Sequence, residues 1–148
     1  SVNRLAKGGL AMKERELMEL AVQARERAYV PYSQFKVGAA LLDSAGQVYL
    51  GCNIENAAFS PTNCAERTAI FKAVSEGVTE FTALAVVADT AEPVTPCGVC
   101  RQVMAEFFDP QMPIILGNLK GDLVKTTLQE LLPASFTAKE FRSDERRD

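Results

Sequence analysis

The spacing of apolar residues along the chain predicts alternating helices and strands. In residues 13–28 the apolar positions recur every three or four residues, which is the period of an amphipathic helix, and this helix is expected to end before Pro31. Its inner face is expected to carry Leu17, Leu20, Ala21, Ala24 and Ala28. Its outer face is expected to carry Glu14, Arg15, Glu19, Gln23 and Arg27.

A β-hairpin is predicted next, with strands at residues 37–42 and 48–54 joined by a turn at residues 43–46. Side chains of the second strand alternate between two faces. One face holds Val48, Leu50, Cys52 and Ile54, and the other holds Tyr49, Gly51, Asn53 and Glu55. This alternation predicts that Cys52 is a buried core thiol and not a metal ligand.

Asn53 and Glu55 then share one face at the end of the strand, roughly 7 Å apart. An amide and a carboxylate can both accept hydrogen bonds from hydroxyl groups, and the amide can also donate, so the pair suits a vicinal diol. Two such residues in isolation are more commonly a solvated strand end. The sequence alone leaves both interpretations open.

Two further helices are predicted behind good N-terminal capping residues. Asn63 is expected to cap the first, with Glu66 at the capping-box distance, and this helix ends near residue 76. Thr95 is expected to cap the second, with Pro96 at its first helical position. We expect the second helix to end near Phe108.

The remaining apolar runs predict strands. Residues 81–89 are almost continuously apolar, as expected of a central strand that is covered on both faces. Shorter strands are expected at 113–116 and 122–126, and Thr127 is expected to open a last short helix. The order of elements predicts an α/β fold, a three-layer α/β/α domain with a mixed five-stranded sheet.

Three cysteines and one glutamate stand at the starts of the two middle helices. Cys64 is expected in the first turn of one helix, and Cys97 and Cys100 on one face of the other. Helix N-termini lower the pKa of a nearby thiol and so favour the thiolate, which is the form that binds metal. Three protein ligands leave a fourth position for water, which is typical of a catalytic zinc.

Each feature taken singly has an ordinary structural interpretation. Glu66 alone fits a capping-box residue, Cys97 with Cys100 fits half of a zinc ribbon or a redox pair, and Cys64 fits an inert buried thiol. Together they match the zinc-deaminase signature, a metal ligand two residues before a glutamate followed by Pro-Cys-x-x-Cys. Cysteine replaces histidine in the first position, and the chain contains no histidine at all.

Through these motifs the sequence resembles the small homotetrameric zinc-dependent cytidine deaminases. The matching stretches are Cys64-Ala65-Glu66-Arg67-Thr68-Ala69, Pro96-Cys97-Gly98-Val99-Cys100-Arg101-Gln102, Gly51-Cys52-Asn53-Ile54-Glu55-Asn56-Ala57-Ala58 and Leu131-Leu132-Pro133-Ala134-Ser135-Phe136. The resemblance covers about residues 14–136. It implies a cytidine-deaminase-like fold with one Zn²⁺ per subunit, held by Cys64, Cys97 and Cys100.

The resemblance also implies roles for the other matched residues. Glu66 would be the catalytic proton carrier, and Arg67 would offset the negative charge of the thiolates. The expected substrate contacts are Phe35 over the pyrimidine ring, Asn53 and Glu55 at the ribose hydroxyls, the backbone of Ala65 at the base, and Phe136 from a neighbouring subunit. From the residues alone, Phe136 fits equally well as an anchor in its own core, and Arg101 and Gln102 have no assigned role.

The implied reaction is hydrolytic deamination of cytidine and deoxycytidine to uridine and deoxyuridine, with release of ammonia. The nearest alternative is a deaminase of a cytosine nucleoside antibiotic such as blasticidin S. Arg67 and the Asn53–Glu55 pair favour the nucleoside. A second alternative is a non-catalytic zinc scaffold, in which four ligands would close the site and Glu66 would only cap a helix.

Composition and charge narrow the partners. The net charge of −3 argues against a polynucleotide substrate, because such substrates require a basic surface. No apolar run approaches the twenty or so residues of a membrane span. Cysteines used as ligands and not as disulfides fit a reducing cytoplasm. These properties favour a small nucleoside substrate and a cytoplasmic location, and the resemblance implies a homotetramer with shared active sites.

The chain length of 148 residues predicts one domain, which we place at residues 12–137. Residues 1–11 lack a helical period and carry a Gly-Gly breaker, so we expect an extension outside the fold, introduced by cloning before a natural Met12. Residues 138–148 alternate Arg with Asp and Glu near the end, and we expect a charged, solvated tail.

Overall fold

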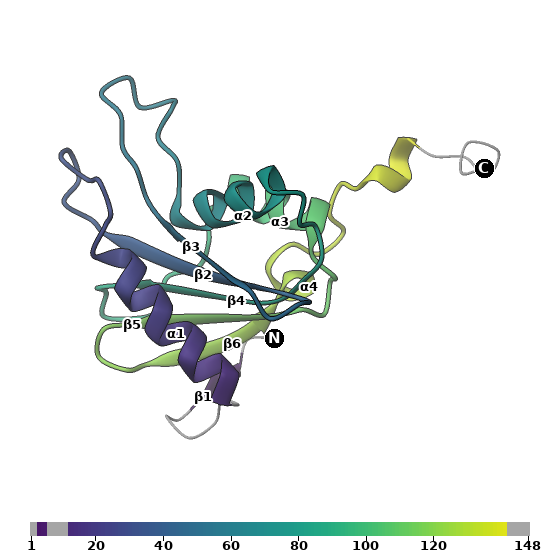
Figure 1. Ribbon diagram of the computed structural model, residues 1–148, viewed down its shortest axis with the longest axis horizontal. Coiled ribbons are helices and arrows are strands. Elements are labelled where there is room, and N and C mark those ends of the chain that lie inside the picture. Colours follow the sequence, from purple (N-terminus) through teal and green to yellow (C-terminus); the bar gives the residue numbers. More distant parts are fainter. Residues whose placement is uncertain (1–2, 6–11, 142–148) are drawn as a thin grey trace.

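The computed structural model describes residues 3–5 and 12–141. Its elements are β1 (Asn3–Leu5), α1 (Met12–Arg25), β2 (Val37–Asp43), β3 (Val48–Cys52), α2 (Ala65–Ser75), β4 (Phe81–Ala88), α3 (Gly98–Phe107), β5 (Pro113–Asn118), β6 (Leu123–Thr127), α4 (Leu128–Leu131) and the 3₁₀ turn η2 (Ala138–Phe141). One sheet runs in the order β1-β6-β5-β4-β2-β3 (Figure 1). β4 and β5 are parallel and all other neighbours are antiparallel. The predicted five-stranded mixed sheet is confirmed for β2 to β6.

The sequence predicts that residues 1–11 lie outside the fold, but some of them belong to it. Asn3–Leu5 form β1, a sixth strand that pairs antiparallel with β6, with Arg4 opposite Val124. A short edge strand of this kind has no helical period, and its three residues carry too weak a pattern to be recognised. The rest of the predicted extension, residues 1–2 and 6–11, lies outside the described residues, as does residue 142 onward of the predicted tail.

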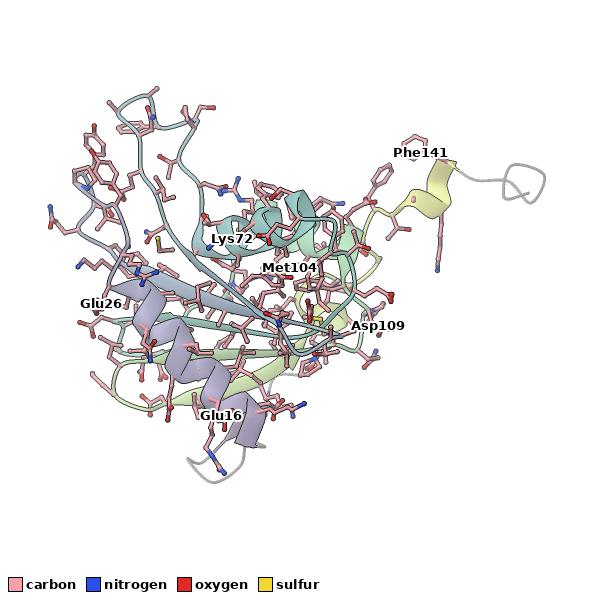
Figure 2. The ribbon with its side chains drawn as sticks, viewed as in Figure 1. Glu16, Glu26, Lys72, Met104, Asp109 and Phe141 are labelled. Atoms are coloured by element: carbon pink, nitrogen blue, oxygen red, sulfur yellow. The ribbon has the colours of Figure 1, made fainter. Side chains whose placement is uncertain are left out.

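Helices cover both faces of the sheet, which gives the predicted three layers (Figure 1). α1 packs on one face through Leu17 and Ala21, while α2 and α3 pack on the other through residues such as Ile70 and Met104. Figure 2 shows Met104 in the interior, Glu16 on the outer side of α1, and Glu26 just beyond the end of that helix; both glutamates are exposed.

β4 is common to both cores. Its residues alternate in the expected way, so that Leu84 and Val86 belong to the core under α2 and α3. Ala83, Ala85 and Val87 belong to the core under α1. Both faces of β4 are therefore buried, in agreement with the continuous apolar run from which a central strand was predicted.

The structure confirms that Leu17, Ala21 and Ala24 lie on the inner face of α1. One residue that was predicted on the outer face is instead buried. Glu14 is buried, with 8% of its surface exposed, and forms an ion pair with Lys125 at 3.0 Å between Nζ and Oε2. Lys125 lies on β6, 111 positions further along the chain, so no local pattern could indicate this partner. The ion pair joins the start of α1 to the sheet.

Two glycines allow the helices to approach the β2–β3 hairpin from opposite faces. A Cβ atom on Gly38 would lie 2.0 Å from the carbonyl oxygen of Ala21 in α1. A Cβ atom on Gly51 would lie 2.4 Å from the carbonyl oxygen of Ala65 in α2. Backbone thus packs directly against backbone at both positions. Because Ala65 begins α2, Gly51 fixes the first turn of that helix against the sheet.

The described part of the chain holds no helix whose length and apolar character would let it cross a membrane.

Candidate active site

Each of the two middle helices begins directly after a cysteine. Cys64 is the N-cap of α2 (φ −73°, ψ 155°) and Cys97 is the N-cap of α3 (φ −67°, ψ 165°). The predicted caps Asn63 and Thr95 were therefore wrong, by one and two residues. Sulfur itself caps α3, since Sγ of Cys97 accepts a hydrogen bond from the backbone N–H of Cys100 at 3.4 Å.

Asn63 does not cap α2 because its groups have other partners. Its backbone exchanges two hydrogen bonds with Ile54, both 2.9 Å long, and its side chain donates to Oγ1 of Thr68 at 3.1 Å. Glu66 consequently occupies the second helical position and is not part of a capping box. The capping interpretation of Glu66 loses its geometric basis.

The three predicted ligands converge at the starts of these helices. The sulfur atoms of Cys64, Cys97 and Cys100 all lie within 4.8 Å of one another, and no other set of potential ligands among the described residues clusters in this way. The sulfurs of Cys64 and Cys97 are 3.8 Å apart. Two sulfurs bound to one tetrahedral Zn²⁺ at about 2.3 Å each are roughly 3.8 Å apart, so the cluster fits zinc.

The cluster contains three ligands and not four. No fourth cysteine or carboxylate of the described residues joins it, and the chain has no histidine. Cys52 lies outside the cluster, as predicted, although it is half-buried and not part of the core. Burial raises the pKa of the Cys52 thiol, which keeps it protonated. The geometry favours an open zinc site over a closed structural one.

Arg67 supports two of the three sulfurs. Its Nε donates to Sγ of Cys100 and its Nη2 donates to Sγ of Cys64, each at 3.4 Å. Arg67 lies in the first turn of α2, so the helix orients the guanidinium toward the cluster. This placement suits the predicted role, because a fixed positive charge offsets part of the thiolate charge.

The thiols differ in their tendency to lose a proton. A hydrogen bond from Cys100, with further contributions from Arg67 and Cys97, lowers the pKa of Cys64 to about 5. The same hydrogen bond, together with burial, raises the pKa of Cys100. These contacts thus favour the thiolate at Cys64, which is the form that binds metal.

Glu66 lies beside the cluster in a nearly closed environment. Only 5% of its surface is exposed, and burial raises the pKa of its carboxyl group to about 7, with a further contribution from the charge of Cys64. A carboxyl group of this pKa can both accept and donate a proton near neutral pH. Ala65, whose backbone was predicted to contact the base, is fully buried at the start of the same helix.

Asn53 and Glu55, which were predicted to bind a vicinal diol, hold the loop between α1 and β2 by hydrogen bonds. Asn53 accepts from the backbone N–H of Val37 at 2.9 Å and donates to the carbonyl of Phe35 at 2.7 Å. Glu55 accepts from the backbone N–H groups of Tyr32 and Ser33 at 3.0 and 3.1 Å, and from the Ser33 hydroxyl. These bonds lower the pKa of Glu55, chiefly the one from the Ser33 hydroxyl.

Ser33 is a residue of this region that the sequence did not reveal. Its hydroxyl bonds to Glu55, and it also accepts from the backbone N–H of Phe35 at 3.0 Å. A shallow pocket here is lined by Tyr32, Ser33, Glu55, Asn56, Phe59 and Thr62. Serine in a loop gives no signal by itself, and its partner is 22 positions away.

The predicted aromatic contacts face solvent in the single chain. Phe35 is 41% exposed and Phe136 is 56% exposed. The interpretation of Phe136 as an anchor in its own core was therefore wrong. Instead the last described part of the chain projects from the body of the domain (Figures 1 and 2). There Phe136 makes an edge-to-face contact with Phe141 at 5.5 Å between ring centroids.

Arg101 and Gln102, which follow the third cysteine, make specific contacts. Arg101 donates from Nε to the carbonyl of Pro96 at 2.7 Å and from Nη1 to the carbonyl of Leu131 at 2.8 Å. Gln102 donates from Nε2 to the carbonyl of Phe136 at 3.0 Å. Both residues thus bind backbone carbonyl groups of other segments, and Arg101 does not bond to the thiols.

Comparisons with known proteins agree with this geometry. The family model of the cytidine and deoxycytidylate deaminase zinc-binding region matches residues 11–116. The chain is 60% identical over 130 residues to a cytidine deaminase of Sporosarcina psychrophila, covering 88% of this chain and 96% of that protein. The crystal structure of cytidine deaminase from Burkholderia pseudomallei matches with a TM-score of 0.81 at 49% identity, covering 86% of this chain and 100% of that one.

A blasticidin-S deaminase of Bacillus cereus is also similar, at 30% identity over 136 residues, covering 86% of this chain and 95% of that protein. Identity to these two cytidine deaminases is higher than identity to this blasticidin-S deaminase.

Proposed function

The chain belongs to the family of zinc-dependent cytidine and deoxycytidylate deaminases, and on this premise we propose that it deaminates cytidine and deoxycytidine with Glu66 as its catalytic residue. The products are uridine or deoxyuridine and ammonia, a reaction of pyrimidine salvage. Its Zn²⁺ ligands are Cys64, Cys97 and Cys100. The observation that carries the assignment is a buried carboxyl group in the first turn of α2, two residues after Cys64, which clusters with Cys97 and Cys100 at the start of α3.

The chemistry divides between the metal and the chain. Zinc held by Cys64, Cys97 and Cys100 would supply a water molecule whose pKa is lowered toward neutrality. Glu66 accepts one proton from that water and donates it to N3 of the cytosine ring, which makes C4 more electrophilic. The water oxygen forms a bond to C4 as the π bond between N3 and C4 opens. Glu66 then takes the second proton from the same oxygen and delivers it to the amino group; the C4–N bond breaks, ammonia leaves, and C4 and the oxygen form a carbonyl group.

The surroundings of Glu66 suit both directions of proton transfer. Its low exposure excludes bulk water, and the nearby Cys64 thiolate disfavours the ionised carboxylate, so the carboxyl group is ready to give the proton back. Arg67 binds sulfur and not Glu66 in the hydrogen-bond network. The charge of Arg67 still lowers the pKa of Glu66, but burial outweighs this effect.

Substrate contacts follow from the residues around this centre. Asn53 and Glu55 are expected to bind the ribose hydroxyls, since each carries oxygen lone pairs beyond the bonds it already makes to the loop. Phe35 is expected to lie over the pyrimidine ring, and the backbone of Ala65 to contact the base. The bonds from Asn53 to Phe35 and Val37 support this arrangement, because they tie the ring contact to the ribose contact.

We further propose a homotetramer in which Phe136 enters the active site of a neighbouring subunit. The exposure of Phe136 and the projection of its segment support this, since an aromatic residue with a specific role in the same chain would be expected to pack against it. The cytoplasm is the expected location, because cysteines that serve as metal ligands and form no disulfide fit a reducing compartment.

Blasticidin S, or another cytosine nucleoside antibiotic, is the alternative substrate. The lower identity to the blasticidin-S deaminase and the intact Asn53–Glu55 pair favour the simple nucleosides. Competition between cytidine and blasticidin S for the purified enzyme discriminates between the two substrates.

An ultraviolet assay of cytidine conversion tests the proposal, run before and after removal of zinc with a strong chelator. We expect turnover that disappears with the metal and returns when zinc is added back. Protein with one zinc per chain that converts neither cytidine nor deoxycytidine would refute the substrate assignment.

A further inference from the structure

Two residues directly after the third cysteine connect the metal helix to the C-terminal segment, defined here as residues 131–136. We propose that Arg101 and Gln102 are positioning residues, which hold this segment, and with it Phe136, in a fixed place relative to the zinc ligands of the same chain. The inference rests on the proposed function only for the role of Phe136 in substrate binding.

Arg101 joins three parts of the molecule. One side of its guanidinium binds the carbonyl of Pro96, the residue immediately before the ligand Cys97, and another N–H binds the carbonyl of Leu131. Hydrogen bonds from a charged donor are roughly twice as strong as neutral ones. Cys97 is the most exposed of the three ligands, so the contact at Pro96 holds the part of the cluster that has least packing around it.

Gln102, the next residue of α3, also binds the C-terminal segment. It lies on the exposed side of α3 and donates to the backbone carbonyl of Phe136, so it fixes the main chain and leaves the ring free to project. Packing anchors the start of the segment, where Leu131 is buried in the core, whereas Pro133, Ala134 and Phe136 are exposed. A groove separates α3 from residues 135–137. Its lining includes Ala105 and Glu106 of α3 together with Ser135 and Thr137.

The backbone of the C-terminal segment is strained at one residue. Ala134 has φ of 54°, in the left-handed region that residues other than glycine rarely adopt. A strained residue persists when its neighbours determine the conformation. Leu131 and Phe136 flank Ala134, and their carbonyls are the ones that Arg101 and Gln102 bind. The two hydrogen bonds therefore set both ends of the turn that directs Phe136 outward.

The test begins with Gln102→Met, which keeps the length of the side chain and removes its N–H donor. We expect the KM for cytidine to rise about fivefold, the change that one neutral hydrogen bond produces in an equilibrium. The kcat should change less than twofold and zinc should remain at one per chain. Hydrogen exchange at the backbone of residues 131–141 should become faster. The control is Gln23→Met on the exposed side of α1, which should change none of these.

A double-mutant cycle with Phe136→Ala shows whether Gln102 acts through Phe136. If it does, Gln102→Met raises KM no further once Phe136 is alanine. A full fivefold effect in that background, or exchange that is unchanged in Gln102→Met, would overturn the inference. If Phe136→Ala leaves KM unchanged while Gln102→Met speeds exchange, the proposed role of Phe136 fails and the positioning role stands.

Arg101→Lys tests the other residue, because it keeps the charge but loses the planar arrangement of two donors. We expect zinc to pass to a coloured chelator several times faster than in wild-type protein, together with faster exchange near Leu131. Wild-type rates for both would overturn the role of Arg101. Zinc release is measured without substrate, so this result does not depend on the reaction.

Discussion

The chain covers part of the thiol cluster, whereas it leaves the aromatic residues expected at the substrate exposed. Cys100 and Glu66 are buried, and Arg67 bonds to two sulfurs of its own chain. Phe35 and Phe136, by contrast, are 41% and 56% exposed. The difference teaches that one chain brings the three thiols and the buried carboxyl group of Glu66 together, while it leaves both predicted aromatic contacts exposed. Four substitutions test this division.

Loss of the exposed ligand should have the largest effect. Cys97→Ala removes one of three thiolates, so we expect the protein to lose most of its zinc and all measurable turnover, while remaining folded. Zinc analysis and circular dichroism of the purified variant measure both. Cys52→Ala is the matched control, since Cys52 lies outside the cluster, and it should keep one zinc per chain. Equal zinc content in the two variants would contradict the assignment of the ligands.

Glu66→Gln should abolish proton transfer and leave the metal in place. The amide keeps the shape of the side chain but cannot carry a proton, so kcat should fall by about 10³-fold, within the range of general acid–base catalysis. Zinc content and thermal stability should stay near those of wild-type protein. A variant with a rate close to wild type would mean that another group moves the protons.

Gly51→Ala should disturb the metal end through packing alone. The added Cβ would meet the carbonyl oxygen of Ala65 at 2.4 Å, so the start of α2 must shift, and we expect a loss of about 1–3 kcal/mol in the free energy of unfolding. Urea denaturation measures it. Gly98→Ala is the control, because a Cβ there meets no atom within 4 Å, and its effect should stay within about 0.5 kcal/mol.

Phe136→Ala should affect only the open side. If the ring contacts substrate in a neighbouring subunit, the KM for cytidine should rise about tenfold, in line with the loss of one aromatic stacking contact, while zinc content and stability remain unchanged. Steady-state kinetics give the KM. A sharper version mixes this variant with inactive Glu66→Gln subunits: recovery of low-KM sites in the mixture is expected only if Phe136 is supplied between subunits.

Local patterns were sufficient to predict most of the fold. The apolar period of α1, the continuous run of β4 and the paired signals of the hairpin are properties of neighbouring residues. Each element formed near its expected position, although α1 ends at Arg25 and not at residue 28, and β3 ends at Cys52 and not at residue 54. The three thiols could also be predicted to meet, since two helix starts with ligand spacing specify a metal site wherever the fold brings them together. Thr127 was identified as a cap for the same local reason, and it accepts from the N–H of Glu130.

Predictions failed where a distant partner decides the outcome. Asn63 has the right chemistry for a cap, but a bridge to Ile54 occupies its backbone. Glu14 sits at an outer position by period, and Lys125 draws it inward. Asn53 and Glu55 were recognised as a polar pair, but their bonds to the loop at residues 32–37 depend on how two separate segments pack. None of these contacts leaves a trace in local sequence.

The sharing of β4 between the two cores has a consequence for cooperativity. Because alternate residues of this strand belong to opposite cores, neither layer of helices can lose its support without exposing the other face of the same strand. The chain is therefore expected to melt in a single transition, and ligand linkage applies to the whole domain. Zinc bound at the starts of α2 and α3 stabilises α1 as well, on the far side of the sheet.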